Sequence, residues 1–514
     1  MPAHAIAAAP PAPMPGLWVA FERMLDRAFG PAANPLRNLG ALGFLLFWVL
    51  AASGIYLYVR FDTSIEGAYA SIQHLSRAEW YLGGVLRSVH RYAADAFVVV
   101  TLAHLAREWA AGRFRRFRAF SWISGVPLVW LLYASGIVGC WLVWDQRALF
   151  SALATAQWLD VLGLGAEPMT RNFVGVGSVG NRLFSLFVFL HVGLPLALLA
   201  GMWVHVQRLG RPRTAPSRAL ALGMLAMLLA AALASPVQSA APADPTHLPA
   251  MLDLDWFVLF AHPLMYATSP GALWVLVGVA TVALIALPRF ARGAAPVTAQ
   301  VSRADCNGCG RCVADCPYQA VLLGPRSDGR RGWQAEVLAE RCAACGICAG
   351  ACPSSTPFRS VRELVSGIDL PDLKVHDLRR RLAQALARLA GRPSVLVFAC
   401  AQAARSDGLA GPGSAVVGLR CLGMLPPSFV EYALRRGAGG VLLLGCREGE
   451  CAYRLGTDLT VARLAGAREP HLRANVPRSR VRVATCGAGE EAQAAAELVQ
   501  LRRALAREPD NAHA

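Results

Sequence analysis

The chain has 514 residues, a formal net charge of +17 and 55% hydrophobic residues. This length predicts two or more domains, and the apolar share exceeds that of a typical soluble domain. The basic residues gather in short loops between apolar runs. Membrane topology explains that pattern better than nucleic-acid binding, so we expect no nucleic-acid partner.

The first 38 residues precede the apolar runs. Residues 1–16 are rich in Ala and Pro and lack the basic start and apolar core of a secretory signal, so we expect them to be disordered. Residues 17–29 can form an amphipathic helix on the membrane surface. We therefore predict a tail and a lipid-contacting surface helix over residues 1–38.

Six apolar stretches follow, at about 39–59, 85–106, 122–144, 184–206, 220–240 and 271–287. The loops after the second, fourth and sixth stretches are rich in arginine, whereas the alternate loops are mixed or acidic. By the positive-inside rule we predict an all-α, six-helix transmembrane bundle over 39–290 in the cytoplasmic (inner) membrane. Both termini and the soluble half would then lie in the cytoplasm.

Two histidine pairs organise this bundle. His90 and His104 lie in the second stretch, His191 and His205 lie in the fourth, and each pair is 14 residues apart. Fourteen residues are close to four helical turns, so both histidines of a pair share one helix face, about 21 Å apart. Two such helices can clamp two flat macrocycles, each iron taking one imidazole from each helix. We predict two b haems, with His90 and His191 on the outer one and His104 and His205 on the one nearer the cytoplasm. A single histidine on an apolar helix face is usually a core residue whose hydrogen bonds are satisfied within the protein. That explanation does not account for two pairs with the same spacing.

Two arginines accompany the histidines. Arg87 lies three residues before His90, and Arg107 lies three after His104. At this spacing each arginine shares a helix face with its histidine and could pair with a haem propionate. Extension of the side chains to lipid headgroups is an equally good explanation.

Residues 35–290 resemble the cytochrome b of the quinol-oxidising bc and b6f complexes. The resemblance rests on the doubled spacing of the histidines, on the stretch Gly139-Cys-Trp-Leu-Val-Trp-Asp-Gln146 and on the glycines Gly40, Gly54, Gly125 and Gly139. It implies two b haems and a quinone substrate with an outer quinone pocket. Because relatives of this family are often dimers, it also suggests a homodimer.

The segment Leu254-Asp255-Trp256-Phe257 stands where that family has Pro-Glu-Trp-Tyr. The resemblance implies that Asp255 accepts a quinol proton, although its side chain is one methylene shorter than the family's glutamate. The alternative is that Asp255 caps a helix at the membrane interface.

After a linker at 291–303, a cysteine pattern occurs twice. Cys306-x2-Cys309-x2-Cys312-x3-Cys316-Pro317 recurs as Cys342-x2-Cys345-x2-Cys348-x3-Cys352-Pro353. Three thiolates at this spacing wrap one face of a [4Fe-4S] cubane, and the fourth of each run reaches the other cluster. We therefore assign one cluster to Cys306, Cys309, Cys312 and Cys352, and the other to Cys342, Cys345, Cys348 and Cys316. A zinc site would need two well-separated pairs instead.

Residues 304–360 resemble a bacterial two-cluster ferredoxin with a hairpin insertion near Asp328-Gly329. The resemblance implies a ferredoxin-like α+β domain that holds two [4Fe-4S] clusters. A charged, helix-prone connector follows at 361–392.

An α/β pattern fills residues 393–514. Short apolar runs at 395–399, 415–419, 440–444 and 481–485 alternate with helical stretches, which is typical of a parallel sheet with crossover helices. Each run ends at or just before a cysteine (Cys400, Cys421, Cys446 and Cys486), and Cys451 follows shortly after. Ligands of open α/β sheets gather beyond the carboxyl ends of the strands, so these thiols suggest a metal centre. Buried inert cysteines are the alternative.

This α/β domain resembles the delta subunit of methyl-viologen-reducing hydrogenase. The matching pieces are Phe398-Ala-Cys400, Arg420-Cys421-Leu-Gly423 and Gly445-Cys446-Arg-Glu-Gly-Glu-Cys451. The resemblance implies a [2Fe-2S] cluster on Cys400, Cys421, Cys446 and Cys451, and electron exchange with a heterodisulfide reductase. The family usually has another cysteine three residues after the first, where this chain has Ala403. Cys486 receives no role.

The parts in series predict a membrane-bound quinone oxidoreductase that is a subunit of a larger redox complex. It would link the quinone pool to a cytoplasmic redox enzyme, such as a heterodisulfide-reductase-like complex, a hydrogenase or a formate dehydrogenase. The alternative is a non-catalytic membrane anchor and docking subunit that relays electrons to a partner holding the quinone site. Either direction of electron flow is compatible with the sequence.

Overall fold

The computed structural model describes residues 16–163, 167–173, 179–246, 249, 251–290, 297–389, 394–447 and 449–507. They divide into two compact units. One comprises the described residues within 19–207 and 212–290, and the other comprises those within 16–18, 208–211 and 297–507. The expected disordered tail up to residue 15, the start of the linker and the end of the connector lie outside the described residues.

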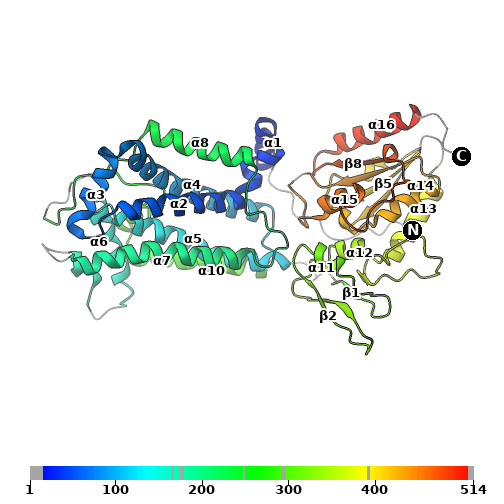
Figure 1. The fold of residues 1–514 in the computed structure, drawn as a ribbon, viewed down its shortest axis with the longest axis horizontal. Helices are drawn as coiled ribbons and strands as arrows, with labels where there is room; N and C mark the ends of the chain where they lie inside the picture. The colour runs from blue at the N-terminus through cyan, green and yellow to red at the C-terminus, as the bar shows by residue number, and fades with distance from the viewer. Residues whose placement is uncertain are drawn as a thin grey trace. The chain divides into compact units, whose positions relative to one another are not determined.

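The first unit is helical (Figure 1). Its helices are α1 (Gly16–Phe29), α2 (Leu39–Arg60), α3 (Ile65–Arg77), α4 (Val85–Ala110), α5 (Ala119–Trp141), α6 (Gln146–Asp160), α7 (Asn181–Val206), α8 (Arg218–Ala234), α9 (Ala261–Ala267) and α10 (Pro270–Phe290). The six stretches predicted as spans correspond to α2, α4, α5, α7, α8 and α10. Three helices, α3, α6 and α9, fall where the sequence predicted only loops. Of these, α3 and α6 begin at a capping side chain, because Ser64 Oγ accepts a hydrogen bond from Gly67 N and Asp145 Oδ1 accepts one from Ala148 N.

Among the described residues, four helical segments are long and apolar enough to cross a membrane: Pro35–Arg60, Arg116–Trp141, Asn181–Val206 and Pro270–Phe290. The helix α8 is apolar but has only 17 residues. The helix α4 carries charged side chains within its length, which lower its hydropathy. The protein is therefore a membrane protein, whereas the count of six spans stays a prediction.

The helices of this unit pack in pairs. The helix α4 packs along α2, and α7 packs along α5. The core between them is lined by large apolar side chains such as Leu46, Phe97, Phe184 and Phe187. The pairing places the histidine-bearing helices, α4 and α7, each against its own glycine-bearing partner.

The second unit begins with short elements around the repeated cysteine motif. These are β1 (Gln300–Val301), α11 (Arg311–Asp315), β2 (Val321–Pro325), β3 (Trp333–Val337), α12 (Ile347–Ala351) and β4 (Ile368–Asp369). Strands β2 and β3 form an antiparallel hairpin around Asp328 and Gly329, and β1 pairs with β4 in antiparallel fashion. Each short helix, α11 and α12, starts directly after the second cysteine of its motif and a left-handed glycine.

The rest of the second unit contains the predicted parallel sheet, which is confirmed. Its strands are β5 (Val395–Cys400), β6 (Ser414–Leu419), β7 (Gly440–Gly445) and β8 (Val481–Thr485), all parallel in the order β6-β5-β7-β8. The helices are α13 (Val375–Arg388), α14 (Pro427–Arg435), α15 (Gly456–Leu464) and α16 (Glu491–Arg507). Helices α13 and α14 cover one face of the sheet and α16 covers the other (Figure 1).

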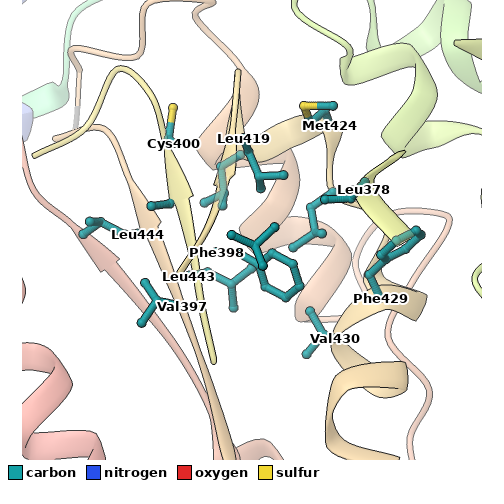
Figure 2. Packing of buried hydrophobic residues seen from close by; sticks show 14 of the residues in the cluster. Leu378, Val397, Phe398, Cys400, Leu419, Met424, Phe429, Val430, Leu443 and Leu444 are labelled. Atoms are coloured by element: carbon teal, nitrogen blue, oxygen red, sulfur yellow. The ribbon is translucent and has the colours of Figure 1, made fainter. Parts of the chain in front are cut away.

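The core of the sheet explains its stability. Strands β5 and β7 are buried on both faces, as expected for central parallel strands. Figure 2 shows Phe398 and Leu443 packed toward Leu378, Phe429 and Val430 of the covering helices. Cys400 stands at the end of β5, beyond this apolar core, so the sheet delivers its thiol to the carboxyl edge.

Candidate redox centres

His90 and His191 face one another from α4 and α7. Their ring centroids lie 6.3 Å apart with an angle of 68° between the ring planes. Two imidazole–metal bonds of about 2 Å, plus two ring radii of roughly 1 Å, span about 6 Å. The pair therefore fits one metal ion between the two rings, which is the arrangement that a bis-histidine haem needs. His205 lies within electrostatic range of His104 in the second pair.

Each of the four histidines packs against a glycine on the neighbouring helix. An added Cβ would lie 3.6 Å from His104 Cε1 at Gly40, 3.1 Å from His90 Cε1 at Gly54, 3.1 Å from His205 Cε1 at Gly125 and 2.6 Å from His191 Cε1 at Gly139. The two glycines of α2 are 14 residues apart, as are the two of α5. At two levels along the bundle, one glycine of α2 and one of α5 therefore each allow an imidazole ring to approach the helix backbone closely.

Hydrogen bonds fix the orientation of three imidazoles. Ser53 Oγ donates to the Val49 carbonyl at 2.7 Å, so it accepts from Nδ1 of His90 at 2.9 Å. Nδ1 of His191 donates to the Ser135 carbonyl at 3.0 Å, and Nδ1 of His205 lies 3.2 Å from Ser124 Oγ. A donated Nδ1–H leaves Nε2 as the lone-pair nitrogen that a metal requires.

The two arginines beside the histidines are buried, Arg87 at 7% and Arg107 at 4% exposure, so neither reaches toward lipid headgroups. Arg87 donates to Ser76 Oγ at 2.5 Å and to Ser239 Oγ at 2.8 Å. Arg107 Nε donates to Glu22 at 2.8 Å. Nη2 of Arg107 is buried without a hydrogen-bond partner in the part of the chain that the structure describes, and a propionate would satisfy it.

Asp255 is engaged in two ways. Its Oδ1 accepts hydrogen bonds from the backbone N–H of Phe257 at 2.8 Å and of Val258 at 3.2 Å, as a capping residue does. Its carboxylate also forms an ion pair with Arg91, which pairs in turn with Asp95. The sequence analysis missed Arg91. A cation inside an otherwise apolar helix, next to His90, was the available signal.

The structure brings together the cysteines of each assigned set in the ferredoxin-like segment. One cavity is lined by Cys306, Cys309, Cys312 and Cys352, which we call the first cysteine set. A second cavity is lined by Cys316, Cys342, Cys345 and Cys348, the second cysteine set. In both, the fourth thiol comes from the other run.

The cavity walls supply donors to sulfur. The backbone N–H of Ala335 points to Cys306 Sγ at 3.4 Å, that of Ala320 to Cys316 Sγ at 3.2 Å and that of Ala344 to Cys342 Sγ at 3.4 Å. Burial raises the pKa of Cys312 to about 12, and burial also raises the pKa of Cys348. Thiolates at such sites need a compensating metal charge, so the two sets fit iron–sulfur clusters.

Four cysteines also converge at the carboxyl edge of the parallel sheet. Cys400 Sγ lies 3.7 Å from Cys446 Sγ, across the point where the strand order reverses. A hydrogen bond with Cys421 lowers the pKa of Cys451, and the same contact raises that of Cys421. We call Cys400, Cys421, Cys446 and Cys451 the sheet-edge set. Among the described residues no three His, Cys, Asp or Glu side chains are placed to hold a single metal ion.

Two further cysteines belong to none of these sets. Cys486, at the end of β8, is fully buried, and burial raises the pKa of its thiol to about 11. The side chains that influence it are Glu490, Glu497 and Arg447 rather than other thiols. Cys140 lies in α5, directly after Gly139.

The three sulfur sites of the second unit form a series. Cys345 of the second set and Cys421 of the sheet-edge set belong to one small apolar cluster with Ile347 and Leu459. Cys312 of the first set is close enough to Cys348 of the second for its charge to affect the pKa of that thiol. The second cysteine set therefore lies between the other two.

Comparisons with known proteins assign the three segments. Residues 25–211 match the family model of cytochrome b/b6/petB, residues 305–356 match a 4Fe-4S dicluster domain, and residues 395–507 match the methyl-viologen-reducing hydrogenase delta subunit. The three resemblances are confirmed. The protein is a membrane-bound electron-transfer protein. The cytochrome b match ends before Asp255, so that residue lies outside it.

One solved structure with a similar chain is described as a hyperthermophilic respiratory Complex III. It is 19% identical over 53% of this protein and 82% of that chain, with a TM-score of 0.42.

Proposed function

We propose that this protein is a quinone oxidoreductase subunit of the cytoplasmic membrane, exchanging electrons between a cytoplasmic redox enzyme and the quinone pool. The observation that carries the proposal is the occurrence in one chain of facing histidines at metal-binding separation and three convergent cysteine sets. Ligand sets for one-electron centres, placed in series, are what a transfer path between cytosol and lipid requires.

In this proposal His90 and His191 hold one b haem, and His104 and His205 hold the other. The first and second cysteine sets each hold a [4Fe-4S] cluster. When bound, these groups supply one-electron redox chemistry at potentials that the surrounding residues tune. Arg107, through its unpartnered Nη2, is the better-suited propionate partner, because both terminal nitrogens of Arg87 already donate to serines.

For the sheet-edge set, the sulfur spacing favours a [2Fe-2S] cluster. Two thiolates on one tetrahedral metal with bonds of about 2.3 Å lie roughly 3.8 Å apart. Cys400 and Cys446 are 3.7 Å apart, which fits two thiolates on one iron. Cys451 contacts both Cys421 and Cys446, so all four thiols converge, and two thiolates on each of two irons would make the proposed cluster.

The order of sites in the second unit supports a direct path. A cytoplasmic partner would exchange electrons with the sheet-edge set, which neighbours the second cysteine set, which neighbours the first. The path continues to the haems and the quinone. The partner is a heterodisulfide-reductase-like complex, a hydrogenase or a formate dehydrogenase, by analogy with the delta subunit family.

The membrane topology completes the proposal. We place six spans in the bilayer, α2, α4, α5, α7, α8 and α10, with both termini in the cytoplasm and the chain as a homodimer. Electron flow toward an outer quinone would then be assisted by the membrane potential, by about 2.3 kcal/mol per charge per 100 mV for a full crossing.

Asp255 would accept the quinol proton at the outer pocket. Its carboxylate is bound by Arg91 and by two backbone N–H groups, so it is held in a fixed position from which it could take the proton. Protonation of Asp255 would weaken its ion pair with Arg91, and Arg91 would keep its second ion pair, with Asp95.

The test is haem reduction by a quinol analogue in the purified, detergent-solubilised protein without any partner. Reduction supports the proposal. Intact haem spectra without reduction support the alternative, a non-catalytic anchor that relays electrons to a partner holding the quinone site. An Asp255→Asn variant should reduce haem more slowly than wild type. Asp253→Asn, a matched change two residues away at an exposed carboxylate, should not. Full activity of Asp255→Asn would remove Asp255 from the proposal.

A further inference from the structure

Two buried arginines of the sheet domain reach the cysteine loop of the ferredoxin-like segment. Arg420, directly before Cys421, is 6% exposed and its Nη1 donates to the Ala344 carbonyl at 3.0 Å. Arg463 of α15 is 0% exposed, and its Nη2 lies 3.4 Å from the Ile347 carbonyl. Ala344 and Ile347 both lie in the segment from Cys342 to Cys348, which carries three of the four cysteines of the second set. Each arginine thus connects the sheet domain to that set.

Arg463 also carries the best-buried ion pair of the described residues. Its Nη2 lies 2.5 Å from Asp315 Oδ2, and Asp315 is 1% exposed and directly precedes Cys316. Arg468 binds the same carboxylate from a half-exposed position. Two guanidinium groups against one carboxylate leave an excess of one positive charge beside the second cysteine set.

The backbones at this junction are in close contact. Nη1 of Arg463 donates to the Gly423 carbonyl at 2.8 Å. A Cβ added at Gly350 of α12 would lie 2.2 Å from that same carbonyl oxygen and 2.8 Å from Nη1 of Arg463. Only a glycine allows this approach, and it brings the loop after Cys421 against the helix that contains Cys348.

Burial of a guanidinium is costly unless it is paired, and a buried cation acts strongly on nearby charge because little water screens it. We propose that Arg463 is a positioning residue that holds the second cysteine set against the sheet-edge set. Through the positive excess shared with Arg468 and Asp315, it also favours the reduced state of the cluster on the second set. The inference rests on the proposed function, because it needs both sets to carry clusters.

The test is a redox titration of the full-length protein in detergent, followed by the electron paramagnetic resonance signals of its clusters. In Arg463→Met, the ratio of reduced to oxidised cluster on the second set should fall at least tenfold at a fixed potential, which corresponds to 59 mV for a one-electron couple. Asp315→Asn removes the counter-charge and should shift the ratio in the opposite direction. Arg380→Met, the same change at an exposed arginine of α13, should leave it unchanged.

The sign of the shift separates an electrostatic role from a structural one. Loss of packing alone would not move the two variants in opposite directions. If Arg463→Met does not retain its clusters, the Asp315→Asn variant decides, because its side-chain amide oxygen can still accept a hydrogen bond from Arg463. A rise in the ratio of reduced to oxidised cluster in that variant supports the inference. An unchanged or lower ratio overturns it. Absence of cluster signals from the wild-type protein would overturn the proposed function and this inference with it.

Discussion

Replacement of Gly139 by alanine should expel or distort one haem and spare the other. The added methyl group would lie 2.6 Å from Cε1 and 3.0 Å from Nδ1 of His191, whereas ordinary contact begins at 3.4 Å. The ring must therefore retreat by 3.4 − 2.6 = 0.8 Å. A metal–imidazole bond of about 2 Å cannot absorb that displacement.

The magnitude follows from the cost of overpacking a well-packed site, about 1–3 kcal/mol. At 1.4 kcal/mol for each factor of ten, haem retention in the His90–His191 site should weaken roughly 5- to 140-fold. Gly40→Ala is the matched control, because its methyl group would lie 3.6 Å from His104 Cε1, an ordinary contact. Both changes sit in helices and gain about the same helix propensity, so that contribution cancels.

The assay is haem content per polypeptide, with a low-temperature difference spectrum that separates the two centres. We expect about one haem in Gly139→Ala and two in Gly40→Ala, with the remaining iron of the first variant still low-spin. Two intact low-spin haems in Gly139→Ala, or equal damage in both variants, would refute the assignment of a haem between His90 and His191.

Three further predictions concern other residues. Cys446→Ser should abolish the [2Fe-2S] signal, whereas Cys486→Ser should keep it, because Cys486 is not one of the four thiols of the sheet-edge set; electron paramagnetic resonance of the reduced protein checks both. Arg91→Gln leaves two carboxylates without their shared cation, so the melting temperature should fall, with a cost of at most about 3 kcal/mol; an unchanged melting temperature would contradict the ion pairs. Burial raises the pKa of Asp369 to about 6 from an ordinary value of 3.8. The stability that its protonated form contributes is therefore present below about pH 4 and lost as the pH rises through about 6. Thermal scans of Asp369→Asn should lack the part of the pH dependence that wild type shows in this window.

The sequence was informative wherever a spacing encodes the geometry of a site. Fourteen residues set the two histidines of a helix on one face because the helical period is fixed, and His90 duly faces His191. Cysteines at a spacing of three around a left-handed glycine must wrap a common centre, and both cavities contain the expected four thiols. The apolar runs of the sheet also lie where the structure has β5 to β8, because buried parallel strands leave continuous apolar stretches.

Other features depended on residues far apart in the chain, which no local pattern links. The ion pair between Arg91 and Asp255 joins α4 to a segment that lies 255 − 91 = 164 positions later in the chain. Because of this pair, the Asp255 carboxylate is bound by a cation rather than free. The burial of Arg107 against Glu22 removed the lipid-headgroup explanation for that arginine in the same way.

The sequence by itself determined which side chains could bind metals, since ligand type and periodic spacing are local properties of a chain. Only the tertiary structure decided which sites are neighbours. The adjacency of Cys345 to Cys421, and the buried Arg463 that holds their loops together, arise from packing between segments more than 70 residues apart, 421 − 345 = 76. Such packing depends on the shape and charge of whole surfaces, so the spacing of residues along the chain does not predict it.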